Sequence, residues 1–278
     1  MKRHFASITT IILTGVLAGL VLIWLYNGSL TQLKQEVFRV SHLPIATVGG
    51  AFISLGEIDQ RAALASAANQ SRAKIFDAVI RERAEAILAA KNHVIAPPAE
   101  IQEEFNALAR ETSGGDVNRF SQVISNNFTM DPAMFQEKLV APQVLDAHLR
   151  IWFNNQPNLN VNVYQKIALL KAALARGDSF ADLAKTYSDD EATKVFGGDT
   201  GNVDLARLLP ELKNSLATAK AGDSIYITSR YGQHVIKVLE RDGDKFHLQT
   251  IFIRQTGYDD WLTRELKTVS VHIFAILN

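Results

Sequence analysis

The sequence predicts an α+β protein in three parts: an N-terminal transmembrane helix, a mainly helical domain, and a small mixed sheet flanked by helices. Three observations carry this prediction. An uncharged apolar run occupies 8–25, apolar residues recur at helical spacing through 54–149, and two strand-like runs follow residue 220. With 278 residues, 47% of them hydrophobic, the chain is long enough to bury more than one core.

Charge and cysteine content exclude several functional classes. Lys and Arg together number 29, as do Asp and Glu, so the chain lacks the basic footprint of a nucleic-acid-binding protein. Cysteine is absent, which excludes structural disulfides, thiol catalysis and zinc ribbons. The sequence also contains no phosphate-binding loop.

The N-terminal apolar run predicts a membrane anchor. Residues 8–25 and their neighbours reach the roughly 20 residues that a bilayer core requires, so we expect a transmembrane helix over 7–26 after a cytoplasmic tail over 1–6. Basic residues precede the run, and by the positive-inside tendency the rest of the chain is exported. A cleaved signal peptide is the alternative, although no A-x-A-like site follows the run before residues 27–29.

A polar linker over 27–44 leads to a mainly helical domain over 45–157. Residues 45–53 read as strand, turn and strand, and Ser54 with Glu57 forms a capping box that starts a long helix. Further helices are expected from residue 98, over 116–126 and from residue 132, the last with a kink at Pro142.

The turn-forming cluster 154–158 marks the boundary to a second domain over 158–245. A helix is expected over 162–176, and Ser179 with Asp182 repeats the capping-box pattern at the start of a shorter one. The remaining elements are a glycine turn at 197–201, a helix over 210–219, and strands over 224–229 and 234–240.

From Ala175 to Glu240 the chain resembles the parvulin family of peptidyl-prolyl isomerases. The resemblance rests on an ordered set of segments: ARGDSFADLAKTYSDDEATKVFGGDTG, then a helix containing LLPELKNSLATAKAGD, then ITSRYGQHVIKV. The preceding helical region is similar in layout to the chaperone region of envelope-associated foldases of the SurA and PrsA kind. The resemblance implies rotation about X-Pro bonds, over a barrier of roughly 18–20 kcal/mol and without bond cleavage, so neither a metal nor a cofactor is implied.

Carried over residue by residue, the resemblance implies a polar cluster in the site. The second active-site His of the family falls on His234, its Cys-or-Asp position on Asp190, and its hydroxyl position on Ser229. Each has a structural alternative. His234 could be a core-facing His bonded to the sheet, and Asp190 could belong to a solvated acidic turn that caps the next helix.

The apolar cradle that grips the proline ring in this family falls on Thr200, Leu208 and Leu212. The family usually has Leu, Met and Phe there, so Thr for Leu and Leu for Phe are departures that weaken the implied grip on the ring. Leu208 and Leu212 also lie one helical turn apart, which is ordinary spacing for residues of a hydrophobic core.

The first strand of the family, which carries its other active-site His, is missing ahead of the second domain. Residues 245–253 instead alternate like a strand after that domain and look like the missing one, displaced to the C-terminal side. In this alignment Thr250 stands at the His position, and His247 would lie on the opposite face. We expect 246–278 to form a strand, a helix and a strand that complete the sheets, with the last strand pairing to 45–53.

Three functional hypotheses follow. In the first, which we take as the prediction, a membrane-anchored extracytoplasmic foldase isomerises X-Pro bonds in unfolded or partly folded exported polypeptides, while the helical domain cradles them. In the second, the site has lost catalysis and the protein is a holding chaperone, which Thr250 and the altered cradle favour. In the third, the protein is a structural partner of another envelope protein, which a specific stoichiometric partner would reveal.

Overall fold

The computed structural model describes residues 44–65, 71–128 and 130–275. The predicted anchor over 7–26, and the linker as far as residue 43, lie outside these residues. Among the residues described, no helix has both the length and the apolar character needed to cross a membrane. The described part is an α+β protein whose helices accompany two small sheets.

The chain divides into two compact units. Unit 1 comprises residues up to 88, together with 106–135 and 266–278, as far as these are described. Unit 2 comprises 89–105 and 136–265. The expected boundary at 154–158 therefore lies inside unit 2.

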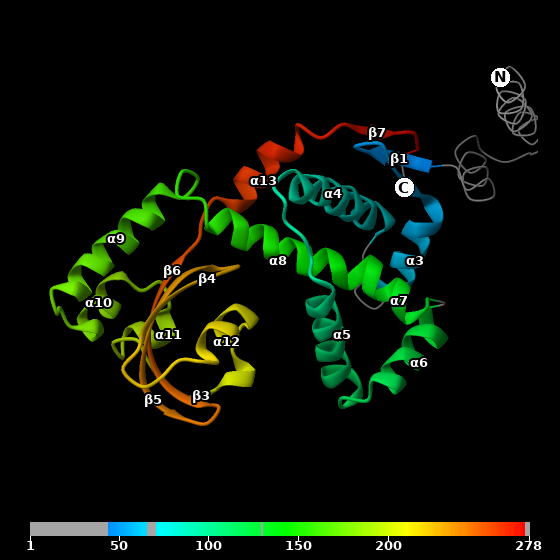
Figure 1. Cartoon of the computed structure of the whole chain (residues 1–278). Coiled ribbons are helices and arrows are strands. Elements are labelled where there is room, and N and C mark those ends of the chain that lie inside the picture. The colour runs from blue at the N-terminus through cyan, green and yellow to red at the C-terminus, as the bar shows by residue number, and fades with distance from the viewer. Residues whose placement is uncertain (1–43, 66–70, 129, 276–278) are drawn as a thin grey trace, which may run out of the picture. The chain divides into compact units, whose positions relative to one another are not determined.

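Unit 1 contains a three-stranded antiparallel sheet in the order β2-β1-β7. Two glycines with positive φ form the tight turn between β1 and β2. Strand β7 lies beside β1 (Figure 1) and pairs with its other edge, where Thr47 is opposite His272. The predicted pairing of the last strand with the first is thus confirmed. The strands are β1 (Pro44–Val48), β2 (Ala51–Ser54) and β7 (Val271–Ile273).

Helices α3 (Leu55–Ala65) and α4 (Arg72–Lys91) follow this hairpin. The hydroxyl of Ser54 accepts a hydrogen bond from the Glu57 N–H at 3.2 Å, which is half of the predicted capping box. The core between sheet and helices is aliphatic, and its fully buried members include Ile45, Val48, Ile53, Ile58 and Val79.

The middle of the chain is helical, as predicted. The Asp131 carboxylate accepts a hydrogen bond from the Met134 N–H at 2.7 Å and caps the turn that begins at Pro132. An irregularity also occurs at the predicted kink, because a π-helical turn gives way to the next α-helix just before Pro142, which lacks an N–H. The elements are α5 (Pro98–Ser113), α6 (Val117–Phe128), α7 (Pro132–Phe135), η2 (Gln136–Val140) and α8 (Ala141–Asn154).

Unit 2 is built on a four-stranded sheet in the order β3-β6-β5-β4. All three pairings are antiparallel, so the prediction of a mixed sheet was wrong. The reason is that β4, β5 and β6 follow one another through short turns, which oblige neighbouring strands to reverse direction. The strands are β3 (Asp199–Asp204), β4 (Ser224–Ser229), β5 (Gly232–Asp242) and β6 (Lys245–Arg254).

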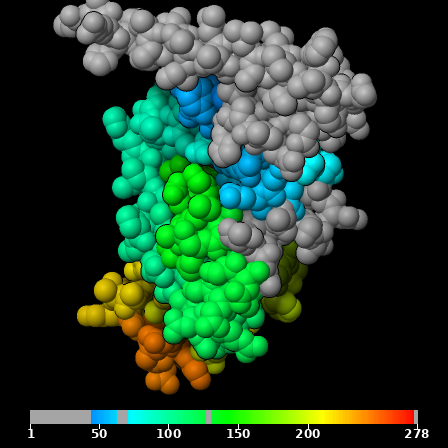
Figure 2. Space-filling view, turned by 90° about the vertical axis from the view of Figure 1, so that its right-hand side faces the viewer, coloured from blue at the N-terminus to red at the C-terminus, as the bar shows by residue number. Residues whose placement is uncertain are grey.

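The strand predicted over 245–253 is confirmed as β6, and it lies inside the sheet between β3 and β5, while its equivalence to the family's first strand stays a prediction. The turn that joins it to β5, orange in Figure 2, lies at the surface. Strand β6 pairs along both of its edges and joins β3 to β5. The four-stranded sheet of unit 2 therefore includes a segment that follows the parvulin-like region of the sequence.

Helices cover both faces of this sheet (Figure 1). On one face, Val235, Ile251 and Ile253 pack against α9 (Val161–Ala175) and α10 (Phe180–Tyr187). On the other face, a second cluster packs against α12 (Pro210–Leu216) and includes Leu212, Leu216, Ile227, Ile236, Val238 and Leu248. The alternation along each strand gives unit 2 two cores, one on each side of the sheet. The remaining elements are α11 (Glu191–Lys194), η3 (Leu205–Arg207) and α13 (Tyr258–Leu266).

Candidate functional site

His234 lies in β5, on the sheet face that α12 covers. It is directly opposite Ile227 of β4 and Phe252 of β6, and directly opposite residues of antiparallel strands share a face. Its ring stacks on that of Phe252, with the centroids 4.8 Å apart. The hydrophobic cluster between this face and α12 is called the α12-side core. His234 is half-buried, so its imidazole lies at the margin of that core.

Ser229 ends β4 and is completely buried. Its hydroxyl oxygen lies 2.8 Å from Nε2 of His234 and accepts a hydrogen bond from the Tyr231 N–H at 3.1 Å. The turn that brings Ser229 back toward His234 requires Gly232. A Cβ at that position would come within 2.2 Å of the Ile253 carbonyl oxygen, and its φ of 150° is one that other residues rarely adopt.

Burial lowers the pKa of His234 to about 4, and the carboxylates of Glu211 and Asp190 only partly oppose this. The imidazole is therefore neutral near pH 7, with one nitrogen that donates and one that accepts. A neutral ring at this place can exchange hydrogen bonds with a polar group beside it without introducing a charge into the core.

Asp190 caps α11, as the structural alternative proposed. Its carboxylate accepts hydrogen bonds from the Ala192 N–H at 3.2 Å and from the Thr193 hydroxyl at 2.6 Å. The loop that carries Asp190 is bound to β6, since the Asp189 N–H donates to the Phe252 carbonyl oxygen at 2.7 Å. Asp190 therefore has a structural task, and its charge also acts on His234.

Thr250 lies in β6, opposite Ile236, and so shares the sheet face of His234. Its N–H donates to the Gly198 carbonyl oxygen at 2.8 Å, and a Cβ at Gly198 would come within 2.3 Å of the Thr250 carbonyl oxygen. The predicted glycine turn is thus pressed against the strand beside Thr250. This close approach explains the need for glycine there.

His247 does not join this cluster. Alternation along β6 turns it to the face opposite Thr250, as predicted, and its Nε2 lies 2.8 Å from the Asp199 carboxylate. The Gly201 N–H and then the bond to His247 lower the pKa of Asp199. His247 therefore does not bring a second imidazole to His234.

Two of the three cradle positions belong to the hydrophobic cluster that packs against α12. Leu212 is buried in it, Leu208 is half-buried against it, and the Thr200 hydroxyl donates to the Leu248 carbonyl oxygen at 3.1 Å. Leu212 therefore does what ordinary core spacing predicts. Its part in holding a proline ring stays a prediction.

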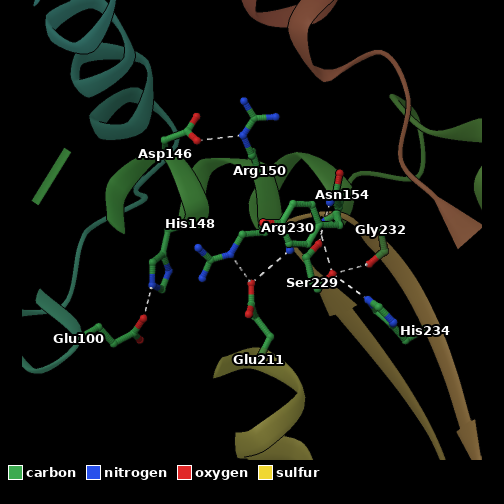
Figure 3. A network of polar contacts seen from close by, with 11 residues as sticks. Glu100, Asp146, His148, Arg150, Asn154, Glu211, Ser229, Arg230, Gly232 and His234 are labelled. Atoms are coloured by element: carbon green, nitrogen blue, oxygen red, sulfur yellow. Dashed lines mark hydrogen bonds and ion pairs between the residues drawn. The ribbon is translucent and has the colours of Figure 1, made fainter. Parts of the chain in front are cut away.

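Several residues around the site were missed by the sequence analysis (Figure 3). Glu211 accepts hydrogen bonds from both the backbone N–H and the Nε of Arg230, at 3.2 and 3.0 Å, and so ties α12 to the β4–β5 turn. Burial alone would raise the pKa of Glu211, but its bonds to its own backbone and to Arg230 lower it overall. Arg230 could have been noted beside Ser229, whereas Glu211 has no local signal.

Among the residues described, no group of three or more His, Asp or Glu side chains is placed to hold a metal ion. A groove of about 820 Å³ lies along α9, lined by Asn162, Lys166 and Leu169 of that helix and by Asp189 and Arg254. It includes none of the predicted site residues.

Comparison with known proteins agrees with the resemblance seen in the sequence. The sequence model of the PPIC-type PPIASE domain matches residues 134–242. Chaperone SurA of Chromohalobacter salexigens is 31% identical over 145 residues, which are 48% of this chain and 33% of that protein. Foldase protein PrsA of Caldanaerobacter subterraneus subsp. tengcongensis is 42% identical over 65 residues, which are 23% of this chain and 21% of that protein.

A crystal structure of peptidylprolyl isomerase PrsA from Bacillus anthracis matches with 20% identity and a TM-score of 0.26, covering 66% of this chain and 83% of that one. The curated relatives are matched over only 16% to 38% of their own lengths. The resemblance to parvulin-type domains of SurA- and PrsA-like foldases is confirmed. The matched segment ends at residue 242, before the central strand β6.

Proposed function

We propose that the PPIC-type domain of this chain catalyses cis-trans isomerisation of X-Pro bonds in exported polypeptides. The observation that carries the proposal is the pair formed by His234 and Ser229, a neutral imidazole in hydrogen-bond contact with a buried hydroxyl beside an apolar core. In this proposal Asp190 and Thr250 border the pair. Thr200, Leu208 and Leu212 contribute to the surface that receives the proline ring.

Isomerisation of an X-Pro bond requires a binding surface of suitable shape and polarity. Rotation breaks no bond, so the site must hold the ring, exclude water from the amide and favour the twisted state. The aromatic face of Phe252 and the leucines of α12 offer an apolar surface, and the hydroxyl and imidazole offer neutral hydrogen-bonding groups to the twisting amide. A charged imidazole would hold more water in the site than a neutral one. The lowered pKa of His234 keeps its imidazole neutral near pH 7.

Catalysed refolding tests this proposal. A client whose slow folding phase is limited by proline isomerisation should refold faster with the fragment 41–278 in substoichiometric amount, since each molecule turns over many times. The His234→Ala variant should lose most of this acceleration. The His247→Ala variant is the matched control and should keep it, because His247 lies on the other face of the same sheet and is bonded to Asp199.

A holding chaperone is the second candidate, and Thr250 in place of the family's first His favours it. In that case the fragment would suppress aggregation only in stoichiometric amount and would leave the proline-limited phase unchanged. The Thr250→His variant separates the two candidates further. If it isomerises and the wild type does not, the site is a degenerate one and the isomerase proposal is wrong.

The cellular place and the client-binding part of the protein are also proposals. The hydropathy of residues 7–26 supports a single-pass anchor with a cytoplasmic N-terminus and extracytoplasmic domains, and the helical region 45–157 would then cradle exported clients. Protease added to intact cells whose outer layers have been removed should digest the chain after the anchor. Complete protection would contradict this arrangement.

A further inference from the structure

Asn154 is the last residue of α8, and it precedes the ordered motifs between Ala175 and Glu240 on which the parvulin resemblance was first based. It is nevertheless one of the most buried polar residues described, with a relative exposure of 1%. Its side chain bonds to Ser229 of β4, which lies beside it in Figure 3, and its carbonyl group bonds to Gln233 of β5, the residue before His234.

We propose that Asn154 is the positioning residue of this site, fixing the β4–β5 turn so that the Ser229 hydroxyl meets the His234 ring. This inference rests on the proposed function, because the turn matters to catalysis only if His234 does. Asn154 itself would touch no substrate. It would act through the backbone of Ser229 and the side chain of Gln233.

Asn154 forms hydrogen bonds with residues on both sides of the β4–β5 turn. Its Nδ2 donates to the Ser229 carbonyl oxygen at 2.7 Å, at the end of β4. Its own carbonyl oxygen accepts from Nε2 of Gln233 at 3.0 Å, at the start of β5. The Ser229 hydroxyl and His234 Nε2 are separated by 2.8 Å, so the hydrogen bond of the site spans the turn that Asn154 holds from both strands.

Asn154 is itself held firmly. The Tyr164 hydroxyl also donates to its carbonyl oxygen, at 3.2 Å, from the first turns of α9. The buried amide of Gln233 is anchored from its other end, because its Oε1 accepts from the Thr228 hydroxyl at 3.1 Å. The turn is therefore linked to α8 and α9 by a connected set of polar groups in a mostly apolar surrounding, where such bonds are strong and directional.

The side chain of Asn154 contributes less to the free energy of unfolding than a residue selected for stability alone would. Its Oδ1 is buried, and among the residues described it has no hydrogen-bond partner. An amide that satisfies one group and leaves another unpaired adds little to stability, whereas an apolar residue would fill the same space without that cost. A requirement to hold the Ser229 carbonyl group explains the amide better.

Two variants and one matched control test the proposal in the full fragment 41–278. Asn154→Ala removes the amide, and Asn154→Leu removes it while keeping most of the volume, so that at least one variant retains the fold. Asn160→Ala is the control. Asn160 is also buried, with a relative exposure of 4%. Its Nδ2 donates to the carbonyl oxygens of Phe153, in the last turn of α8, and of Gln156, and its Oδ1 accepts from Gln255 after β6, so none of these bonds reaches β4 or β5.

The first readout is the His234 ring in an NMR pH titration, which needs no substrate. In both Asn154 variants the hydrogen-bonded ring signal should weaken, and the pKa should rise from about 4 toward 6.5 because the loosened turn lets water in. The second readout is catalysed exchange of a proline peptide, which should fall about tenfold or more as the pair loses its geometry. The Asn160→Ala control should change neither.

The outcomes separate this proposal from the proposed function. If folded Asn154 variants keep the wild-type titration of His234, Asn154 does not position the site and the proposal is wrong. If the titration changes but the wild type shows no catalysed exchange, the positioning is right and the isomerase function is wrong. If Asn160→Ala shifts His234 as much as the Asn154 variants do, general loosening explains the effect and the proposal is also wrong.

Discussion

The sequence identified His234 as a candidate site residue, and the structure adds a property of its side chain that the sequence did not show. The parvulin pattern identified it and Ser229 together, and the structure brings their side chains into contact. The sequence could not reveal the lowered pKa, since this comes from burial under α12 and against Phe252 rather than from any neighbour in the chain. Asn154 and Glu211 were missed for the same reason, because their contacts exist only once distant elements pack.

The lowered pKa of His234 predicts a pH dependence of stability. Between about pH 6.5 and about pH 4 the unfolded chain binds a proton at this ring and the folded chain does not, so the free energy of unfolding should decrease as pH falls through that window. The loss should approach about 3 kcal/mol at pH 4. Urea unfolding at several pH values, for the wild type and His234→Gln, measures it.

The contribution of His234 is the difference between the two proteins. Asp199 and Glu211, whose carboxyl pKa values are lowered, also destabilise the fold in acid, but they remain in both proteins and cancel in the difference. If His234→Gln lost stability between pH 6.5 and pH 4 as steeply as the wild type, the ring would not be held neutral by the fold.

Among the elements, β6 decides whether unit 2 can form its sheet. It pairs with β5 over most of its length and with β3 along its other edge. Its alternating pattern was visible in the sequence, and so was its resemblance to a missing strand. The antiparallel arrangement was not predicted, because strand direction follows from turn length and the pattern alone does not give it.

Truncation tests the role of β6. A fragment that ends at Asp242 keeps the whole segment that matches the PPIC-type family but leaves β3 and β5 with unpaired inner edges, so we expect it to lack cooperative unfolding and to aggregate. A fragment that ends at Glu265 keeps β6 and most of α13, and we expect its unit 2 to unfold cooperatively. Calorimetry and circular dichroism distinguish the two. A well-folded fragment ending at Asp242 would show that β6 is dispensable.

At the scale of the whole molecule, the order of elements along the chain and the order of strands in space differ. The strands β1 and β7 come from opposite ends of the described chain and pair in unit 1, while the parvulin-like strands pair with a segment that follows them in unit 2. The helical spacing and the capping boxes predicted most helices from local sequence. The units themselves are assembled from separate segments, and local patterns do not reveal such groupings.

NMR exchange spectroscopy on an Ala-Pro peptide is the most direct test of the central claim, that the site around His234 isomerises X-Pro bonds. Uncatalysed exchange takes tens of seconds, so even weak catalysis by the fragment 41–278 is visible. We predict exchange cross-peaks with the wild type that disappear with His234→Ala. A folded wild-type fragment that gives no cross-peaks with Ala-Pro or acidic-Pro peptides would contradict the claim.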